Sequence, residues 1–396
     1  MTPLREGSAL ARYALVVLWT GVAMAADKTV RLECKWQPHV VQQHQDDTHV
    51  ASPARQLDLI NPQAWGHSFI YLPDKNRLVL QTGNLQLSSD DLGTTWSRAS
   101  APPRRHLTYL GNGKVLARAW SIGQRLVSDD YGKTWRPFAP IPPSPGLKVV
   151  FAMGADLVDT DPATGNVVRL AESITRRIRF STDGGLTWPT SIQAPWSAET
   201  TLVRAGNGDI VAATRTSNRT GYRKVTGADM PDAAKVAYDK WRVGTGFDFY
   251  CGLGVHISKD NGKTWSAINQ LYTHGRHHAS PVRMPNGDLV MTYVVRLGYG
   301  DAPDGLPQYG IEGVVSHDHG QSWELDRRYV LDKWHGEWEG DPGGKVKLMA
   351  PNETYTVVLR DGSLMTSFER GVQGPGVEYH RTVKLVHWRL DEDTAR

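Results

Sequence analysis

One short pattern of polar and aromatic residues recurs five times along this chain of 396 residues and constrains its fold more than any other feature. The pattern is Ser-x-Asp-x-Gly-x-Thr/Ser-Trp. Its copies are SSDDLGTTW (88–96), SDDYGKTW (from Ser128), STDGGLTW (from Ser181), SKDNGKTW (from Ser258) and SHDHGQSW (from Ser316). Recurrence along most of the chain indicates a repeat architecture, in which each repeat is one supersecondary unit that packs against its neighbours.

A predicted β-hairpin precedes each of these turns, and one more hairpin follows the last turn. Asn-Gly or Asp-Gly between alternating apolar residues is the strongest short signal for a hairpin. Clear copies occupy residues 109–120, 202–216, 281–296 and 357–370, and weaker ones occupy 71–83 and 158–172. A hairpin, a third strand, a polar turn and a fourth strand make one propeller blade. Residues 26–396 are therefore predicted to form an all-β, six-bladed β-propeller, with a strand from Lys28 completing the last blade.

The residue types of the turn suit a structural role. The Asp can accept hydrogen bonds from nearby amides, the Gly supplies a positive φ, and the Trp can pack between adjacent strands or blades. Five equivalent carboxylates distributed around a ring cannot converge on one substrate. The repeated acids are therefore predicted to stabilise the turns.

The N-terminal 25 residues differ from the rest of the chain. A basic start, an apolar run of about a dozen residues and the small residues Ala23 and Ala25 are typical of a secretory signal peptide. We therefore expect a secreted or periplasmic protein with no membrane span after signal cleavage, since no other apolar run approaches the ~20 residues of a span. An uncleaved anchor is the alternative. Cys34 and Cys251 are the two cysteines, and the sequence does not decide whether they pair.

The overall composition favours an ordinary globular protein. Hydrophobic residues make up 40% and charged residues 22% of the chain, as in typical globular domains. The net charge of +4 and the lack of a basic run argue against a nucleic-acid partner. The sequence also gives no sign of a cofactor.

Blade topology predicts where a substrate binds. If the turns and hairpin tips lie on one face of the ring, the first strand of each blade begins on the other face, and the second strand ends there. The starts carry His67, Arg105, His106, Glu199, His277, His278 and Tyr355. The ends carry Asn84, Arg118, Arg215, Arg296, Glu369 and Arg370. In four blades the second strand thus ends in an arginine. Arginines grouped in this way are suited to bind a carboxylate through two hydrogen bonds each, so the sequence predicts an anionic substrate.

The repeated turns resemble the Asp boxes (BNR repeats) of the sialidase, or neuraminidase, superfamily of six-bladed propellers. Two stretches also resemble its catalytic segments: ETTLVRAGNGDIVAATR, from Glu199 to Arg215, and YTVVLRDGSLMTSFER, from Tyr355 to Arg370. The resemblance implies that Tyr355 is the nucleophile and Glu199 its base. It also implies that Arg215 binds the substrate carboxylate and that Glu369 steadies an arginine.

The chain departs from the family pattern at three positions. The first blade reads HSFIYLP where the family has Arg-Ile-Pro, and Asn84 or Gln86 stands where the family has an acidic proton donor. QYGIEGVV lacks the third arginine of the family's triad, and Arg296 is its nearest substitute.

A cluster in HGRHHASP, comprising Arg276, His277 and His278, lies at the start of the fifth hairpin. One of the histidines could replace the missing proton donor. It could instead abstract a proton from a uronate in β-elimination, with Tyr355 as the acid. Metal binding is disfavoured because neighbouring residues of a strand point to opposite faces, and no metal is expected.

The preferred function is that of a sialidase-like glycoside hydrolase, exo-acting on a terminal anionic sugar (sialic or uronic acid) of a glycan. A polysaccharide lyase and a non-catalytic glycan-binding propeller are the alternatives. The long insert after Thr216 is predicted to form a lid over the site, with a surface decoration as the alternative. Oligomeric state and sugar linkage are not predicted.

Overall fold

The computed structural model describes residues 36–45, 48–61, 66–100, 105–118, 125–140, 154–161, 163–196, 199–216, 251–296, 308–335, 351–374 and 377–390. The predicted signal peptide, Cys34 and most of the predicted lid (217–250) lie outside these ranges. Cys251 is buried. Within the described ranges, no helix is long and apolar enough to cross a membrane.

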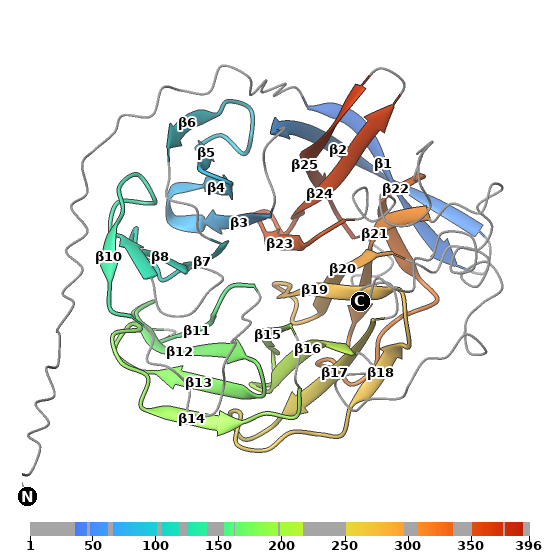
Figure 1. The fold of residues 1–396 in the computed structure, drawn as a ribbon. Coiled ribbons are helices and arrows are strands. Elements are labelled where there is room, and N and C mark those ends of the chain that lie inside the picture. Colours follow the sequence, from blue (N-terminus) through green and yellow to red (C-terminus); the bar gives the residue numbers. More distant parts are fainter. Residues whose placement is uncertain are drawn as a thin grey trace, which may run out of the picture.

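Four separate four-stranded antiparallel sheets form part of a propeller around a common centre (Figure 1). The first contains β3 (His67–Leu72), β4 (Arg77–Thr82), β5 (Leu85–Ser89) and β6 (Ser97–Ser100). The second contains β7 (Arg105–Tyr109), β8 (Val115–Arg118), β9 (Arg125–Ser128) and β10 (Arg136–Phe138). The third contains β11 (Leu157–Thr160), β12 (Val167–Ile174), β13 (Arg177–Ser181) and β14 (Thr190–Gln193). The fourth contains β15 (Thr200–Arg204), β16 (Ile210–Thr216), β17 (Gly252–Ser258) and β18 (Asn269–Tyr272).

The nine remaining strands form one continuous sheet in the order β19-β20-β21-β22-β1-β2-β25-β24-β23. Its first part contains β19 (Arg276–Arg283), β20 (Leu289–Val295), β21 (Gln308–Ser316) and β22 (Arg328–His335). The others are β1 (Gln37–Gln45), β2 (Thr48–Asn61), β23 (Thr354–Val358), β24 (Leu364–Gly374) and β25 (Val377–Trp388). A single 3-10 turn, η1 (Pro73–Lys75), is the one helical element in the described ranges.

The predicted all-β propeller is confirmed, and all six predicted hairpins form, including the two weaker ones. The predicted strand at Lys28 is not the one that completes the last hairpin sheet. β2, which begins at Thr48, pairs with β25 from Arg55 to Asn61, and residues 28–35 lie outside the described ranges. The N-terminal part of the chain therefore joins the C-terminal part within one sheet.

The five repeated turns have one hydrogen-bonding scheme. In the turn from Ser181, the Asp183 carboxylate accepts bonds from the amide and hydroxyl of Thr187 at 2.9 and 2.6 Å, and Ser181 accepts one from the Gly185 amide at 2.8 Å. The other four turns repeat these contacts. The structural role predicted for the repeated acids is therefore confirmed.

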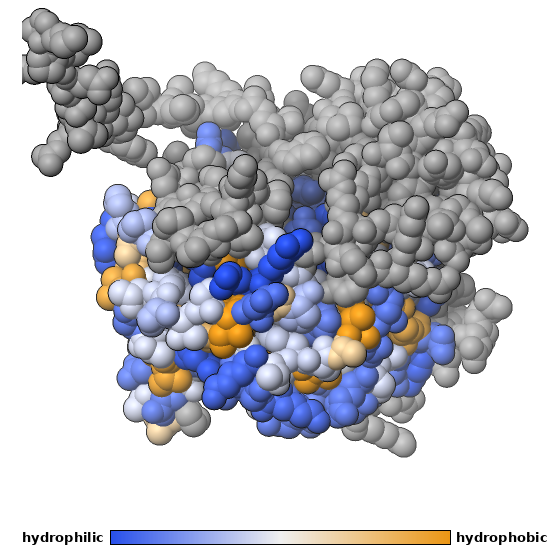
Figure 2. Space-filling view, turned by 60° about the horizontal axis from the view of Figure 1, so that its bottom comes forward, coloured by the Kyte–Doolittle hydropathy of each residue, from blue (hydrophilic) through white to orange (hydrophobic). Residues whose placement is uncertain are grey.

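Each turn also packs its tryptophan into a core cluster that includes residues of a neighbouring sheet. Trp188, for example, packs with Leu116 and Val127 of the second sheet. The Gly185 backbone lies so close to that sheet that a Cβ there would come within 3.3 Å of Leu116. The surface beyond this core is mostly hydrophilic on the face shown in Figure 2, where apolar residues lie in small separate groups.

Candidate active site

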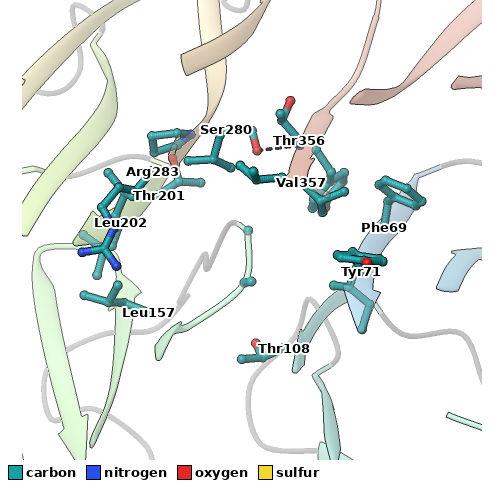
Figure 3. Close-up of a pocket in the computed structure, with 18 of the residues that line it drawn as sticks. Phe69, Tyr71, Thr108, Leu157, Thr201, Leu202, Ser280, Arg283, Thr356 and Val357 are labelled. Atoms are coloured by element: carbon teal, nitrogen blue, oxygen red, sulfur yellow. Dashed lines mark hydrogen bonds between the residues drawn. The ribbon is translucent and has the colours of Figure 1, made fainter. Parts of the chain in front are cut away.

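The first strands of the sheets surround a cavity of about 660 Å³ at the centre of the ring (Figure 3). Hydroxyl groups link these inner strands near their beginnings. Ser68 accepts a bond from the Leu107 amide and Ser280 accepts one from the Thr356 amide, both at 2.9 Å. Thr108 Oγ1 similarly accepts from the Asp156 amide at 2.9 Å. These bonds connect neighbouring inner strands around the cavity, and we call the end at which Asp156, Glu199, His278, Glu353 and Tyr355 line it the mouth.

Tyr355 lies at this mouth and is 7% exposed. Its hydroxyl donates a hydrogen bond to Glu353 Oε2 at 2.7 Å and lies 3.3 Å from His106 Nδ1. Since the phenolic proton is directed to Glu353, the remaining contact requires His106 Nδ1 to act as the donor. The sequence paired Tyr355 with Glu199, and this pairing is wrong, because Glu353 occupies that position at the hydroxyl.

Glu369 lies behind the tyrosine rather than in the cavity. His67 packs edge-on against the Tyr355 ring with 5.0 Å between ring centroids, and its Nδ1 lies 3.6 Å from Glu369 Oε1. His67 Nε2 lies 3.0 Å from Ser367 Oγ. Both His67 and Glu369 are buried, so Glu369 lies beside the ring that packs on Tyr355.

Glu199 and His278 line the cavity and share a contact with Arg215. Arg215 Nη1 donates to Glu199 Oε1 at 3.0 Å and lies 3.3 Å from His278 Nε2. A guanidinium can only donate, so this second contact requires a lone pair on His278 Nε2 and favours the neutral ring. His277 packs beside His278 with ring centroids 4.4 Å apart, and it is fully buried.

Two of the histidines occupy strained backbone positions. His106 has φ of 65° and His278 has φ of 53°, values that non-glycine residues seldom adopt. Each lies where the pairing of an inner strand with its neighbour is interrupted, between Arg105 and Leu107 in one case and between His277 and Ser280 in the other. Such bulges redirect side chains and are frequent beside active sites. Their recurrence in two sheets supports the assignment of this mouth as the functional site.

Arg118 holds two carboxylates at the same mouth. Its Nη1 donates to Asp156 Oδ1 at 2.8 Å and to Glu172 Oε1, and its Nη2 donates to the Gly154 carbonyl at 2.9 Å. Burial raises the pKa of Asp156 to about 6, with Arg118 opposing the shift and Glu172 adding to it. Asp156 lines the cavity.

The other predicted substrate-binding arginines lie away from the cavity lining. Arg276 pairs with Glu312 at 2.8 Å and stacks over the Tyr272 ring, and Glu312 raises the pKa of Arg276 against the effect of burial. Arg296 donates to the Pro351 carbonyl at 3.0 Å. Arg370 lies 3.4 Å from Asp332 and over the Trp334 ring. These contacts give all three a structural role in the fold.

Two residues at the mouth escaped the sequence prediction, Glu353 and Asp156. Glu353 lies two residues before Tyr355, a spacing that places side chains on the same face of a strand, so the pattern Glu-x-Tyr could have revealed it. Asp156 immediately precedes β11, at the position that Glu199 occupies before β15. Among the described residues no group of three or more His, Cys, Asp or Glu side chains could hold a metal ion.

Residues 256–267, around the fourth repeated turn, match the BNR/Asp-box repeat family. No curated protein matches the chain by sequence. This match identifies the repeated turns as Asp boxes and is consistent with the sialidase-like superfamily indicated by the motifs.

Solved structures similar to this chain are also propeller proteins. A protein of unknown function from Dyadobacter fermentans has 16% identity and a TM-score of 0.50 over 91% of this chain and 97% of its own. The GH93 α-L-arabinofuranosidase of Fusarium graminearum, solved with arabinobiose, has 13% identity and a TM-score of 0.50 over 83% and 96%. The NanB sialidase of Streptococcus pneumoniae has 13% identity and a TM-score of 0.42 over 92% and 57%. At such identities the first two matches establish a shared fold, and no more.

Proposed function

We propose that this protein is a glycoside hydrolase whose active site is the mouth defined by Tyr355, Glu353, Glu199 and Asp156. One observation carries the proposal: the Tyr355 hydroxyl, at the rim of a cavity, donates at 2.7 Å to a buried carboxylate. A carboxylate at this distance can accept the phenolic proton as the oxygen attacks. The glycoside hydrolases among proteins of similar fold add support.

The proposed reaction has two steps. In the first, the Tyr355 oxygen bonds to the anomeric carbon while its proton passes to Glu353. The glycosidic C–O bond breaks with its electron pair on the leaving oxygen, which takes up one proton. In the second, water attacks the anomeric carbon, the bond to Tyr355 breaks, and Glu353 returns its proton to the phenolate. The attacking water loses one proton to the group that protonated the leaving oxygen, which restores that acid. A neutral nucleophile of this kind tolerates a negatively charged sugar.

The substrate that we propose is a terminal anionic sugar, sialic or uronic acid, on a glycan. Arg215 is the guanidinium best placed to bind its carboxylate, since it contacts two residues of the cavity wall, Glu199 and His278. Arg118 shows that a guanidinium in this site can hold two carboxylates at once. Glu199 would then orient Arg215 rather than activate Tyr355.

A lyase is the second candidate, and the 3.3 Å contact between Tyr355 and His106 favours it. A tyrosine acid beside a histidine base suits β-elimination from a uronate. The histidine in contact with Tyr355 is His106, whereas the sequence favoured His277 or His278 for this role.

A panel of sialosides, uronosides and neutral arabinofuranosides, with product masses as the readout, tests the function. We expect release of an intact anionic sugar by the wild type and loss of turnover in Tyr355→Phe, with folding little changed apart from about 1 kcal/mol for the lost hydrogen bond. A product lighter by one water, with the absorbance of an unsaturated uronate, would indicate the lyase. Binding without turnover would indicate a lectin-like propeller, and a preference for arabinofuranosides would exclude the anionic substrate.

We propose further that the ring has six blades. The nine-stranded sheet contains two runs of four neighbouring strands, β19-β20-β21-β22 and β23-β24-β25-β2, with β1 between them. This arrangement supports two additional blades joined by β1, which add to the four separate sheets.

We also propose that the protein is exported after cleavage near Ala25, on the sequence pattern of its first residues. Mass determination of the exported protein's N-terminus tests this proposal.

A further inference from the structure

Arg118, Asp156 and Glu172 form a buried cluster with one positive charge and two carboxyl groups. The Asp156 and Glu172 side chains are 6% and 2% exposed, and both accept a bond from the same nitrogen, Arg118 Nη1. Because both carboxyl groups bind one nitrogen, their oxygens lie close together and repel each other when both are ionised. Two acids that share a buried site therefore favour a state in which one of them holds a proton.

The proton belongs on Asp156 in this pair. Its pKa is raised to about 6, chiefly by burial, and its side chain is the one of the two that lines the cavity. The charged groups that face it are Arg118 from β8, Arg125 from β9 and Glu172 from β12, and Arg179 from β13 faces Glu172 in turn. Glu172 raises the pKa of Asp156, whereas Arg118 and Arg125 lower it.

The position of Asp156 exposes it to a ligand in the cavity. It precedes β11 directly, its amide is held by Thr108, and it lines the same cavity as Tyr355, Glu353 and Glu199. Arg118, its partner, lies close enough to Tyr355 to interact with it electrostatically. Figure 3 shows Thr108 and Leu157, the neighbours of Asp156, on the side of the cavity opposite Ser280.

We infer that Asp156 is the proton donor to the leaving group, with Arg118 and Glu172 as positioning residues, an inference that rests on the proposed hydrolase function. As the glycosidic C–O bond breaks, the Asp156 carboxyl proton moves to the leaving oxygen, and Asp156 becomes a carboxylate. In the second step Asp156 takes one proton from the attacking water as its oxygen bonds to the anomeric carbon. The cycle returns Asp156 to its acid form and consumes one water.

His278 is the competing donor, and its surroundings argue against that role. A donor must direct a proton to the leaving oxygen, but His278 Nε2 lies 3.3 Å from Arg215 Nη1 and accepts from that guanidinium. Asp156 is thus the better candidate for the proton donor. The sequence has no acid in the position where the family has its proton donor, because Asn84 or Gln86 stands there.

Leaving-group dependence in Asp156→Asn tests the inference. The probes are the methyl and dinitrophenyl glycosides of the same sugar, sialic or glucuronic acid. Dinitrophenolate departs without a proton, so the variant should lose activity on the order of 10²- to 10⁴-fold on the methyl glycoside and far less on the dinitrophenyl glycoside. Asp159→Asn is the matched control on the same strand, because Asp159 pairs with Arg169 and Arg204 away from the cavity. Equal losses on both probes in a folded Asp156→Asn protein would overturn the inference.

The pH dependence of Glu172→Gln supplies a second test. Turnover of the methyl glycoside should decline as pH rises through the pKa of Asp156, since the donor must be protonated. Removing the Glu172 charge lowers that pKa, so this decline should move to lower pH. An unchanged profile would contradict the inference.

Infrared difference spectra separate this inference from the proposed function, because they need no substrate. A carboxylic-acid C=O band that titrates near pH 6 in the wild type and is missing in Asp156→Asn would support a proton on Asp156 even if no glycoside is hydrolysed. In that case the hydrolase proposal alone would fail. Absence of such a band would overturn the inference, whatever the hydrolytic activity.

Discussion

Tyr355 and Glu353 form a hydrogen-bonded pair because Tyr355 lies at the start of β23 and Glu353 immediately precedes that strand. Glu353 is buried, and Tyr355 lines the cavity. His106 approaches the same oxygen from β7, through a backbone bulge that costs conformational energy. In the proposed mechanism Glu353 is the base, Tyr355 the nucleophile and His106 an orienting histidine.

Glu353→Gln tests the base at residue scale. The amide keeps the size of the side chain and can still accept a hydrogen bond, but it cannot take up the phenolic proton. We expect kcat on the identified glycoside to fall on the order of 10²- to 10⁴-fold. In Glu199→Gln, which disturbs the partner of Arg215, we expect chiefly a higher KM. Equal losses of kcat in the two variants would remove the distinction between base and orienting residue.

The sequence located Tyr355, Glu199 and His278 at the mouth but misassigned the partner of the tyrosine. A family resemblance transfers a role to the residue that matches by position, and Glu199 matches. The choice between Glu199 and Glu353 depends on how the strand starts lie in space, which no motif records. The partners of the arginines escape prediction for a similar reason: strand position predicts which end of a strand a guanidinium occupies, but not the carboxylate that binds it.

At the scale of the element, the Asp box is a turn that also connects sheets. Trp188 is 6% exposed and packs with Leu116 and Val127 of the preceding sheet, and its Nε1 donates to the Gly185 carbonyl at 3.2 Å. The composition of the turn is sufficient to predict its packing and its local hydrogen bonds, because Ser, Asp, Gly and Thr form hydrogen bonds with one another within the turn. The sequence therefore predicted this element correctly.

Trp188→Ala should destabilise the fold without changing the chemistry. Removal of a buried tryptophan costs about 3–5 kcal/mol, because transfer free energy is lost and a cavity remains. Urea unfolding measures the loss, and kcat below the melting temperature should match that of the wild type. Leu186→Ala is the control, since Leu186 is 52% exposed and should change stability by less than about 0.5 kcal/mol. An unchanged unfolding midpoint with abolished turnover would contradict the structural role.

At the scale of the whole molecule, the repeats predicted the propeller, but they did not predict which N-terminal strand pairs with the C-terminal strand β25. The repeated units were recognised from five Asp boxes and six hairpins, but the strand beside β25 carries neither motif. β2 is recognised only by its pairing with β25 from Arg55 to Asn61. A strand identified by a partner far away in the chain leaves no local signal, and the prediction of Lys28 as its start was wrong for that reason.

The five boxes together should make the whole propeller sensitive to acid. Hydrogen bonds from the Thr side chain and amide lower the pKa of Asp183 and of Asp260 to about 2. Burial opposes the shift in the other three boxes, but similar hydrogen bonds outweigh it and lower the pKa of each carboxylate. An acid with a lower pKa in the folded than in the unfolded state adds stability above about pH 4, and this stability is lost as pH falls toward 2.

We therefore expect the melting temperature to fall steeply between about pH 4 and pH 2, as all the box carboxylates become protonated in parallel. The pKa values of Asp90, Glu312 and Asp361 are lowered as well, so these carboxylates add to the same loss of stability. Two other buried groups act at higher pH. Burial lowers the pKa of His387 to about 4, which costs stability as pH falls from about 6.5 to 4, and the raised pKa of Asp156 adds stability between about pH 6 and 4. Asp183→Asn isolates one box: its melting temperature should lie below that of the wild type at pH 7, and the difference should shrink as pH approaches 2. A difference that stays constant from pH 7 to pH 2 would show that the Asp183 charge does not contribute to the stability of the ring.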